Sequence, residues 1–298
     1  MRDVLLTALA PIIWGTTYFV TTQFLPSNRP LFVSAIRAAP IGLLMLAGFR
    51  ELPKGIWLWR VSVLGTLNIG LFFALLFTAA YRLPGGVVAT LMAIQPLVVA
   101  LLAWVILAEH PRLRTFIAAS LGLFAVGLVV LGPAVRFDTV GVIAGVAATL
   151  VMACGTVLTK RWGRSAPLLV FTSWQLVAGG LMLLPFAFVI EGAPPPLTTM
   201  NLLGFGWLGM VGTGIAYALW FRGIGKMKAS TVAILGLLSP VSAMLLDFLL
   251  LKKSLTRMQI GGAALVLGTI LISQLRGEEE SSTTLYQNAP GSRAIEPD

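Results

Sequence analysis

The chain has 298 residues, of which 57% are apolar and only 11% are charged, and its mean hydropathy is +0.92. This composition excludes a water-soluble globular protein, because so few polar residues cannot cover the surface of a chain of this length. The formal net charge of +10 would suit a protein that binds nucleic acid, but the placement of the basic residues, described below, argues against that partner.

Ten apolar segments follow one another along the chain, separated by short connections that leave no room for a soluble catalytic domain. Most of them have the roughly 20 residues that a helix needs to cross the hydrocarbon layer of a bilayer. We therefore expect an all-α polytopic membrane protein with ten transmembrane helices. The predicted segments are residues 4–25, 31–49, 61–80, 86–107, 116–131, 141–158, 168–190, 202–221, 231–251 and 258–275. Residues 277–298 are rich in Ser, Thr, Pro and acidic residues, which predicts a disordered tail.

The two halves of the chain resemble each other. Aligned without gaps, residues 64–107 and 208–251 share 13 of 44 residues, and Pro96 falls on Pro240. Each half has five segments, an odd number, so the second half enters the bilayer from the opposite side. We therefore expect two inverted five-helix repeats that form one transport domain around a midplane site and give alternating access. The predicted repeats are residues 1–137 and 138–276.

The basic residues gather on one side of the predicted segments. With the N-terminus in the cytoplasm, fourteen Lys and Arg residues fall on the cytoplasmic side and six fall on the opposite side. Cytoplasmic loops of membrane proteins carry this excess of positive charge. The bias predicts that both termini are cytoplasmic, and it explains the net charge by orientation in the lipid bilayer rather than by binding to nucleic acid.

Two opposite charges lie well inside predicted segments. Arg37 is the only base so placed and Asp247 the only acid. A charge within the membrane marks a functional site or a buried pair. Three interpretations stay open: Arg37 and Asp247 form a structural pair, Arg37 presents its planar donor fork to a substrate carboxylate, or Arg37 extends to the membrane interface.

Pro96 and Pro240 occupy equivalent places near the middle of their segments. Each removes a backbone donor and frees the carbonyl four residues earlier, at Met92 and Gly236, which kinks the helix. A symmetric pair near the midplane predicts two hinges. Static kinks are the alternative, because proline is tolerated in membrane helices.

Polar and aromatic side chains are spread over several segments and are candidates for a substrate-binding cavity, since such cavities combine apolar walls with a few polar groups. The candidates are Trp14, Thr17, Tyr18, Arg37, Asn68, Gln95, Trp174, Gln175, Tyr217 and Trp220. For each of them, a hydrogen bond between helices or a place in the interfacial aromatic belt is the alternative interpretation.

The sequence lacks the motifs of common catalytic and nucleotide sites. It has no Gly-x4-Gly-Lys-Ser/Thr phosphate loop, which predicts that ATP is not used. A single His and a lone Cys154 leave no basis for a metal cluster or a catalytic dyad. We expect no cofactor, no metal and no enzymatic activity.

Several motifs resemble the EamA-type carriers of the drug/metabolite transporter superfamily. These motifs are PIIWGTTY at residues 11–18, Ala35-Ile36-Arg37 in the second segment, and a proline-centred fourth segment that ends in Leu107-Ala108-Glu109. The first of them, followed by Leu25-Pro26 and Arg29-Pro30-Leu31, is similar to the branch of amino-acid exporters.

The resemblance implies a carrier of the bacterial inner (plasma) membrane that exports amino acids, aromatic ones first, from the cytoplasm. Its partners would be a small-molecule substrate and the bilayer. An exporter of other small metabolites or cationic drugs is the first alternative. A non-transporting membrane receptor or an intramembrane enzyme is the second.

Overall fold

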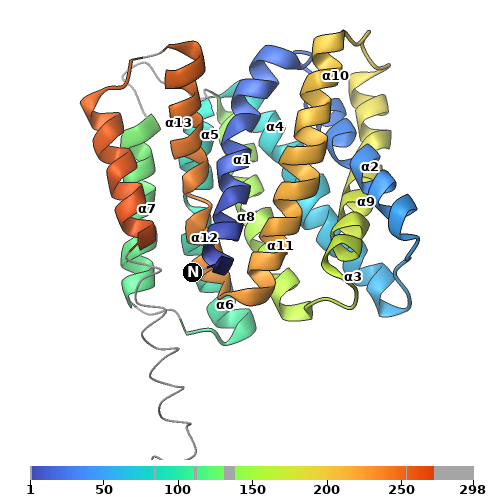
Figure 1. Ribbon diagram of the computed structural model, residues 1–298, viewed down its shortest axis with the longest axis horizontal. Coiled ribbons are helices and arrows are strands. Elements are labelled where there is room, and N and C mark those ends of the chain that lie inside the picture. The colour runs from blue at the N-terminus through green and yellow to red at the C-terminus, as the bar shows by residue number, and fades with distance from the viewer. Residues whose placement is uncertain (1, 84, 111–112, 131–137, 253, 272–298) are drawn as a thin grey trace, which may run out of the picture.

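The computed structural model describes residues 2–83, 85–110, 113–130, 138–252 and 254–271, and all regular secondary structure within these ranges is helical (Figure 1). The first half contains α1 (Arg2–Phe24), α2 (Pro30–Phe49), α3 (Ile56–Gly65), η1 (Thr66–Gly70), α4 (Leu71–Arg82), α5 (Gly85–Met92), α6 (Gln95–Leu107) and α7 (Leu113–Val130). The second half contains α8 (Thr139–Trp162), α9 (Leu168–Phe186), η2 (Ala187–Glu191), α10 (Thr199–Gly206), η3 (Trp207–Ile215), α11 (Ala216–Lys226), α12 (Ala229–Leu235), α13 (Leu238–Leu251) and a last helix, Arg257–Leu271. The segments labelled η are π-helical. The predicted tail, residues 277–298, lies outside the described residues.

Eight helical stretches in the described ranges are long and apolar enough to cross a membrane. Two further apolar stretches, Thr115–Leu128 within α7 and the last helix, Arg257–Leu271, are shorter within the described residues, and they correspond to the predicted segments 116–131 and 258–275. Large apolar side chains lie on the outer surface: Val105 is 75% exposed and Val189 is 85% exposed. Helices that are apolar on their outer as well as their inner faces are suited to lipid, so the fold is that of a polytopic membrane protein.

Local sequence signals set where several helices begin. Pro30 stands at the start of α2, where its missing N–H costs nothing. The Asp138 carboxylate accepts a hydrogen bond from the Gly141 N–H at 2.7 Å and caps α8. Thr198 and Asn201 form a capping box at the start of α10.

Two long helices, α1 and α8, pack mainly against helices from the other half of the chain. Helix α1 packs on α11 and α13 of the second half, and α8 packs on α4 and α6 of the first half. Figure 1 shows α1 between α13 and α11. Because each half packs a long helix against the other half, the two halves form one bundle.

The contact between α2 and α9 depends on glycine. A Cβ atom added to Gly180 on α9 would lie 2.5 Å from the backbone nitrogen and 2.7 Å from the Cα atom of Ala39 on α2. A Cβ atom added to Gly42 on α2 would lie 2.8 Å from the backbone nitrogen of Val177 on α9. The two helices therefore touch backbone to backbone, as small residues permit in membrane bundles.

We expect Gly180→Ala to lower the free energy of unfolding by about 1–3 kcal/mol, because the added methyl group forces the backbones of α2 and α9 apart. Gly48→Ala is the matched control on α2, because nothing lies within 4 Å of the added Cβ atom. Alanine is also the better helix former, so the control should be neutral or slightly stabilising. Thermal unfolding of the detergent-solubilised proteins measures the difference, and equal stability of the two variants would contradict the backbone contact.

Candidate functional site

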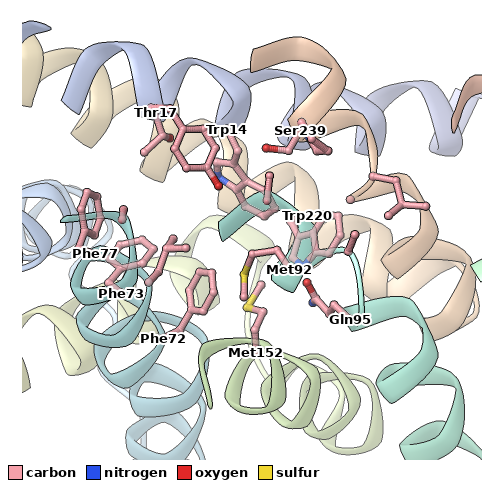
Figure 2. Close-up of a pocket in the computed structure, with 18 of the residues that line it drawn as sticks. Trp14, Thr17, Phe72, Phe73, Phe77, Met92, Gln95, Met152, Trp220 and Ser239 are labelled. Atoms are coloured by element: carbon pink, nitrogen blue, oxygen red, sulfur yellow. The ribbon is translucent and has the colours of Figure 1, made fainter. Parts of the chain in front are cut away.

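A cavity of about 170 Å³ lies between α1, α2, α4, α8, α11 and the helix pairs α5–α6 and α12–α13 (Figure 2). This volume is similar to that of engineered apolar cavities that hold one benzene molecule. The cavity is therefore large enough for a ligand with a single aromatic ring, and both halves of the chain contribute to its walls.

The two helix pairs that line the cavity are broken helices. Helix α5 ends at Met92 and α6 begins at Gln95, while α12 ends at Leu235 and α13 begins at Leu238. Hydrogen bonds of the 3-10 type, between residues three apart, span each break. They run from the Ile94 N–H to the Leu91 carbonyl at 3.3 Å and from the Leu237 N–H to the Ile234 carbonyl at 3.1 Å. Pro96 and Pro240 follow the breaks directly and line the cavity. The carbonyl of Gly236, which loses a partner because of Pro240, accepts instead from the Ser239 N–H at 3.0 Å.

Arg37 places a charge against this cavity although its side chain is only 2% exposed. Its Nε donates to the Thr213 hydroxyl at 2.8 Å, and its Nη2 donates to the Gly212 carbonyl at 3.0 Å. The guanidinium carbon lies 4.4 Å from the centre of the Phe73 ring, which is within the range of a cation–π interaction. The π-helical segment η3 supplies both oxygen acceptors, as π-helical turns often do at functional sites.

The predicted pair of Arg37 and Asp247 is not tested. The backbone of Asp247 belongs to α13, but its side chain lies outside what the structure describes. In Figure 1, α2 and α13 stand on opposite sides of α1, while the described partners of Arg37 come from η3 and α4. The pair remains a prediction.

Aromatic rings form one continuous wall of the cavity. Trp14 on α1 contacts Tyr217 and Trp220 on α11, each with ring centroids 5.1 Å apart, and Tyr217 contacts Phe73 at 5.8 Å. The indole N–H of Trp14 donates to the Gly212 carbonyl at 3.0 Å, the same oxygen that Arg37 binds. The rings of α1 and α11 are thus fixed relative to the guanidinium.

The structure brings most of the predicted substrate-binding residues together at this cavity. Seven of the ten line it: Trp14, Thr17, Tyr18, Arg37, Gln95, Tyr217 and Trp220. The apolar lining residues Phe72, Phe73, Phe77, Met92 and Met152 were not predicted. For Phe73 and Phe77, the sequence signal was their spacing of four residues, which places both side chains on the same face of a helix.

The other three predicted residues lie outside the cavity lining. The Asn68 amide donates to the Thr159 hydroxyl at 2.9 Å and to the Gln175 amide oxygen at 2.8 Å, which joins η1, α8 and α9. The Trp174 indole N–H donates to the Glu51 carbonyl at 2.7 Å in the loop between α2 and α3. These side chains form hydrogen bonds between elements, which was the alternative interpretation of each.

Among the described lining residues, Arg37 carries the only charge, and no carboxylate faces the cavity. The described residues also contain no group of three or more His, Cys, Asp or Glu side chains that could hold a metal ion. The chemistry of the lining is therefore that of a binding site with a cation, aromatic rings and a few neutral donors.

Comparison with known proteins adds independent evidence. The chain is 44% identical over 267 residues to Protein PecM of Dickeya dadantii, covering 89% of this chain and 90% of the relative. It is 25% identical over 285 residues to a probable amino-acid metabolite efflux pump of Salmonella typhimurium, covering 91% of this chain and 94% of the relative. One solved crystal structure shares the fold with a TM-score of 0.80 at 18% identity, covering 93% of this chain and 98% of the other.

The family model of the EamA-like transporters matches the chain twice, over residues 1–131 and 139–274. These two matches cover nearly all of the chain. The family and the transporters among the relatives point to transport and away from enzymatic activity. The protein is therefore a membrane transporter that belongs to the EamA-like transporter family.

Proposed function

We propose that the protein is a secondary transporter that exports amino acids, aromatic ones first, from the cytoplasm across the bacterial inner membrane by alternating access. The observation that carries this proposal is the cavity between two broken helices, in which Arg37 is the charged group and aromatic rings form the wall. The Salmonella typhimurium relative, named a probable amino-acid metabolite efflux pump, supports the same substrate class.

The cavity matches the two ends of an aromatic amino acid. A guanidinium carries five N–H donors in a planar fork, more than the two that bond Thr213 and Gly212, and it suits a carboxylate. Trp14, Tyr217 and Phe72 offer ring faces to an aromatic side chain. The same faces attract the α-ammonium group through cation–π interactions, so a carboxylate is not needed in the wall.

The alternating-access part of the proposal rests on correspondences between the halves. Helices α1 and α8 each pack against the opposite half. The π-helical segments η1 and η3 fall in corresponding places, as do the breaks before Pro96 and Pro240. Ala108 and Lys252 are separated by 144 residues, the same offset that aligns residues 64–107 with 208–251. Both adopt left-handed backbone conformations, with φ of 53° and 52°. In the proposed topology, the ten helices form two inverted repeats with hinges at the two breaks.

Export of cationic drugs is the weaker alternative. A cavity for cations needs an acidic side chain, whereas the described lining offers Arg37 and no carboxylate. Export of another small metabolite with an anionic group and an apolar body would use the same features, and parallel substrates distinguish it.

Purified protein in liposomes should carry labelled Trp, Phe or Tyr in counterflow without ATP, because the proposed mechanism needs only a gradient of substrate. A cationic dye tested in parallel should not move, since Arg37 repels it. Movement of the dye without movement of any amino acid would replace the amino-acid assignment with drug efflux.

The proposed topology is tested by single-cysteine labelling in a Cys154→Ala background. Ala193→Cys, in the loop after η2, should react with a membrane-impermeant maleimide in intact cells, because that loop is expected to face the periplasm. Ser165→Cys, in the loop after α8, should react only after permeabilisation. Both residues are exposed, so accessibility of the side chain does not limit the reaction. Labelling of Ala193→Cys only from the inside would overturn the inverted arrangement.

The role of Arg37 is tested by Arg37→Leu, Asp247→Leu and the double variant. If Arg37 holds the substrate carboxylate, Arg37→Leu should stay folded and lose about tenfold to a hundredfold in apparent affinity, the effect of a lost charged hydrogen bond. Asp247→Leu should then transport normally.

A structural pair gives a different result in the same experiment. Each single variant would lose about 3–5 kcal/mol of stability, and the double variant would recover much of it. Thermal unfolding and counterflow on the four proteins separate the two roles. A stable and fully active Arg37→Leu would exclude both.

A further inference from the structure

Two hydrogen-bond donors in the cavity wall have no partner within the described residues. The indole Nε1 of Trp220 and the amide Nε2 of Gln95 are both buried and unpaired, and both residues line the cavity. The Thr21 hydroxyl in the same lining is also unpaired, but a hydroxyl can either donate or accept. The indole nitrogen can only donate, so Trp220 requires an acceptor.

These donors lie at the end of the cavity away from Arg37. Figure 2 shows Phe73 and Phe77 on one side of the cavity and Trp220 and Gln95 on the other. The guanidinium of Arg37 lies over the Phe73 ring, at 4.4 Å from its centre. The rings of Tyr217 and Trp14 connect Phe73 to Trp220 through successive contacts of 5.8, 5.1 and 5.1 Å. The cavity is thus bounded by a cation at one end and by neutral donors at the other, with aromatic and methionine side chains between them.

An unpaired buried donor makes a site selective. A ligand that places an oxygen atom between Trp220 and Gln95 satisfies both donors, whereas a ligand with a plain hydrocarbon end leaves them unpaired. Sites that hydrogen-bond a substrate hydroxyl discriminate strongly against the analogue that lacks it. A phenolic oxygen can accept hydrogen bonds from such donors.

We propose that Trp220 and Gln95 bind an oxygen acceptor on the aromatic ring of the substrate. The carrier then prefers ring-hydroxylated aromatic amino acids, such as tyrosine, over phenylalanine and tryptophan. Tryptophan offers only an indole donor at its ring, which meets two further donors. This inference rests on the proposed function, because it assumes that Arg37 holds the carboxylate at the other end.

The experiment compares counterflow of labelled Tyr, Phe and Trp in proteoliposomes of the wild type, Trp220→Phe and Gln95→Leu. In the wild type, the apparent affinity for Tyr should exceed that for Phe by about tenfold or more. Each variant has an apolar side chain at the substituted position and lacks one donor. The ratio of the apparent affinities for Tyr and Phe should therefore fall to within about threefold. 4-Aminophenylalanine resembles Tyr in shape, but its ring nitrogen substituent is a weaker acceptor than a phenolic oxygen, so it should behave like Phe.

Trp207→Phe is the matched control. Trp207 lies on η3 outside the cavity lining, and its indole N–H donates to the Thr16 hydroxyl at 2.9 Å. The control therefore loses one indole donor without changing the cavity, and its Tyr-to-Phe ratio should equal that of the wild type. Thermal unfolding of each variant shows that it is folded, and Gln95→Leu tests the idea independently of Trp220→Phe.

The possible failures are distinguishable. If the wild type carries Tyr and Phe with equal affinity, or if the ratio persists in both cavity variants, the inference is overturned and the proposed function stands. If none of the three amino acids moves, the proposed function is wrong and this inference falls with it.

Discussion

The buried guanidinium of Arg37 is the constraint on which the arrangement of the site depends. A charge inside an apolar bundle is tolerated only where hydrogen bonds and polarisable groups replace its hydration. Thr213 and Gly212 of η3 supply the oxygen acceptors, and Phe73 of α4 supplies a ring face. Because η3 and α4 come from different halves of the chain, satisfying this one charge fixes the two halves against each other beside the cavity.

The corresponding place in the other half carries no charge. Gln175 is the eighth residue of α9, as Arg37 is the eighth residue of α2. Arg37 binds Gly212 in the π-helical η3, and Gln175 binds Asn68 in the π-helical η1. One contact is a hydrogen bond from a charged donor and borders the cavity, while the other is a hydrogen bond between two neutral amides outside the cavity lining. Two similar halves thus give a site with different ends.

Much of the fold follows from simple features of the sequence. Apolar length located the helices, because a bilayer requires it, and the two prolines marked the breaks, because proline lacks a donor. Polarity alone did not separate Gln95, which lines the cavity, from Gln175, which pairs with Asn68. Both are amides in apolar helices, and only the neighbouring helix decides which role is taken. Phe72 and Met152 were missed because most residues of such helices are apolar, so the face that meets the cavity leaves no pattern.

The glycine contact between α2 and α9 has a consequence for movement. Where Gly42 and Gly180 bring main chain against main chain, no layer of side chains remains that could change rotamer and let one helix slide past the other. The two helices belong to different halves, so they form a stiff spine across the molecule. In the proposed mechanism, opening of the cavity is then left to helices outside this contact. The most deformable of these are α5–α6 and α12–α13, whose hydrogen-bond ladders are already interrupted where they meet the cavity.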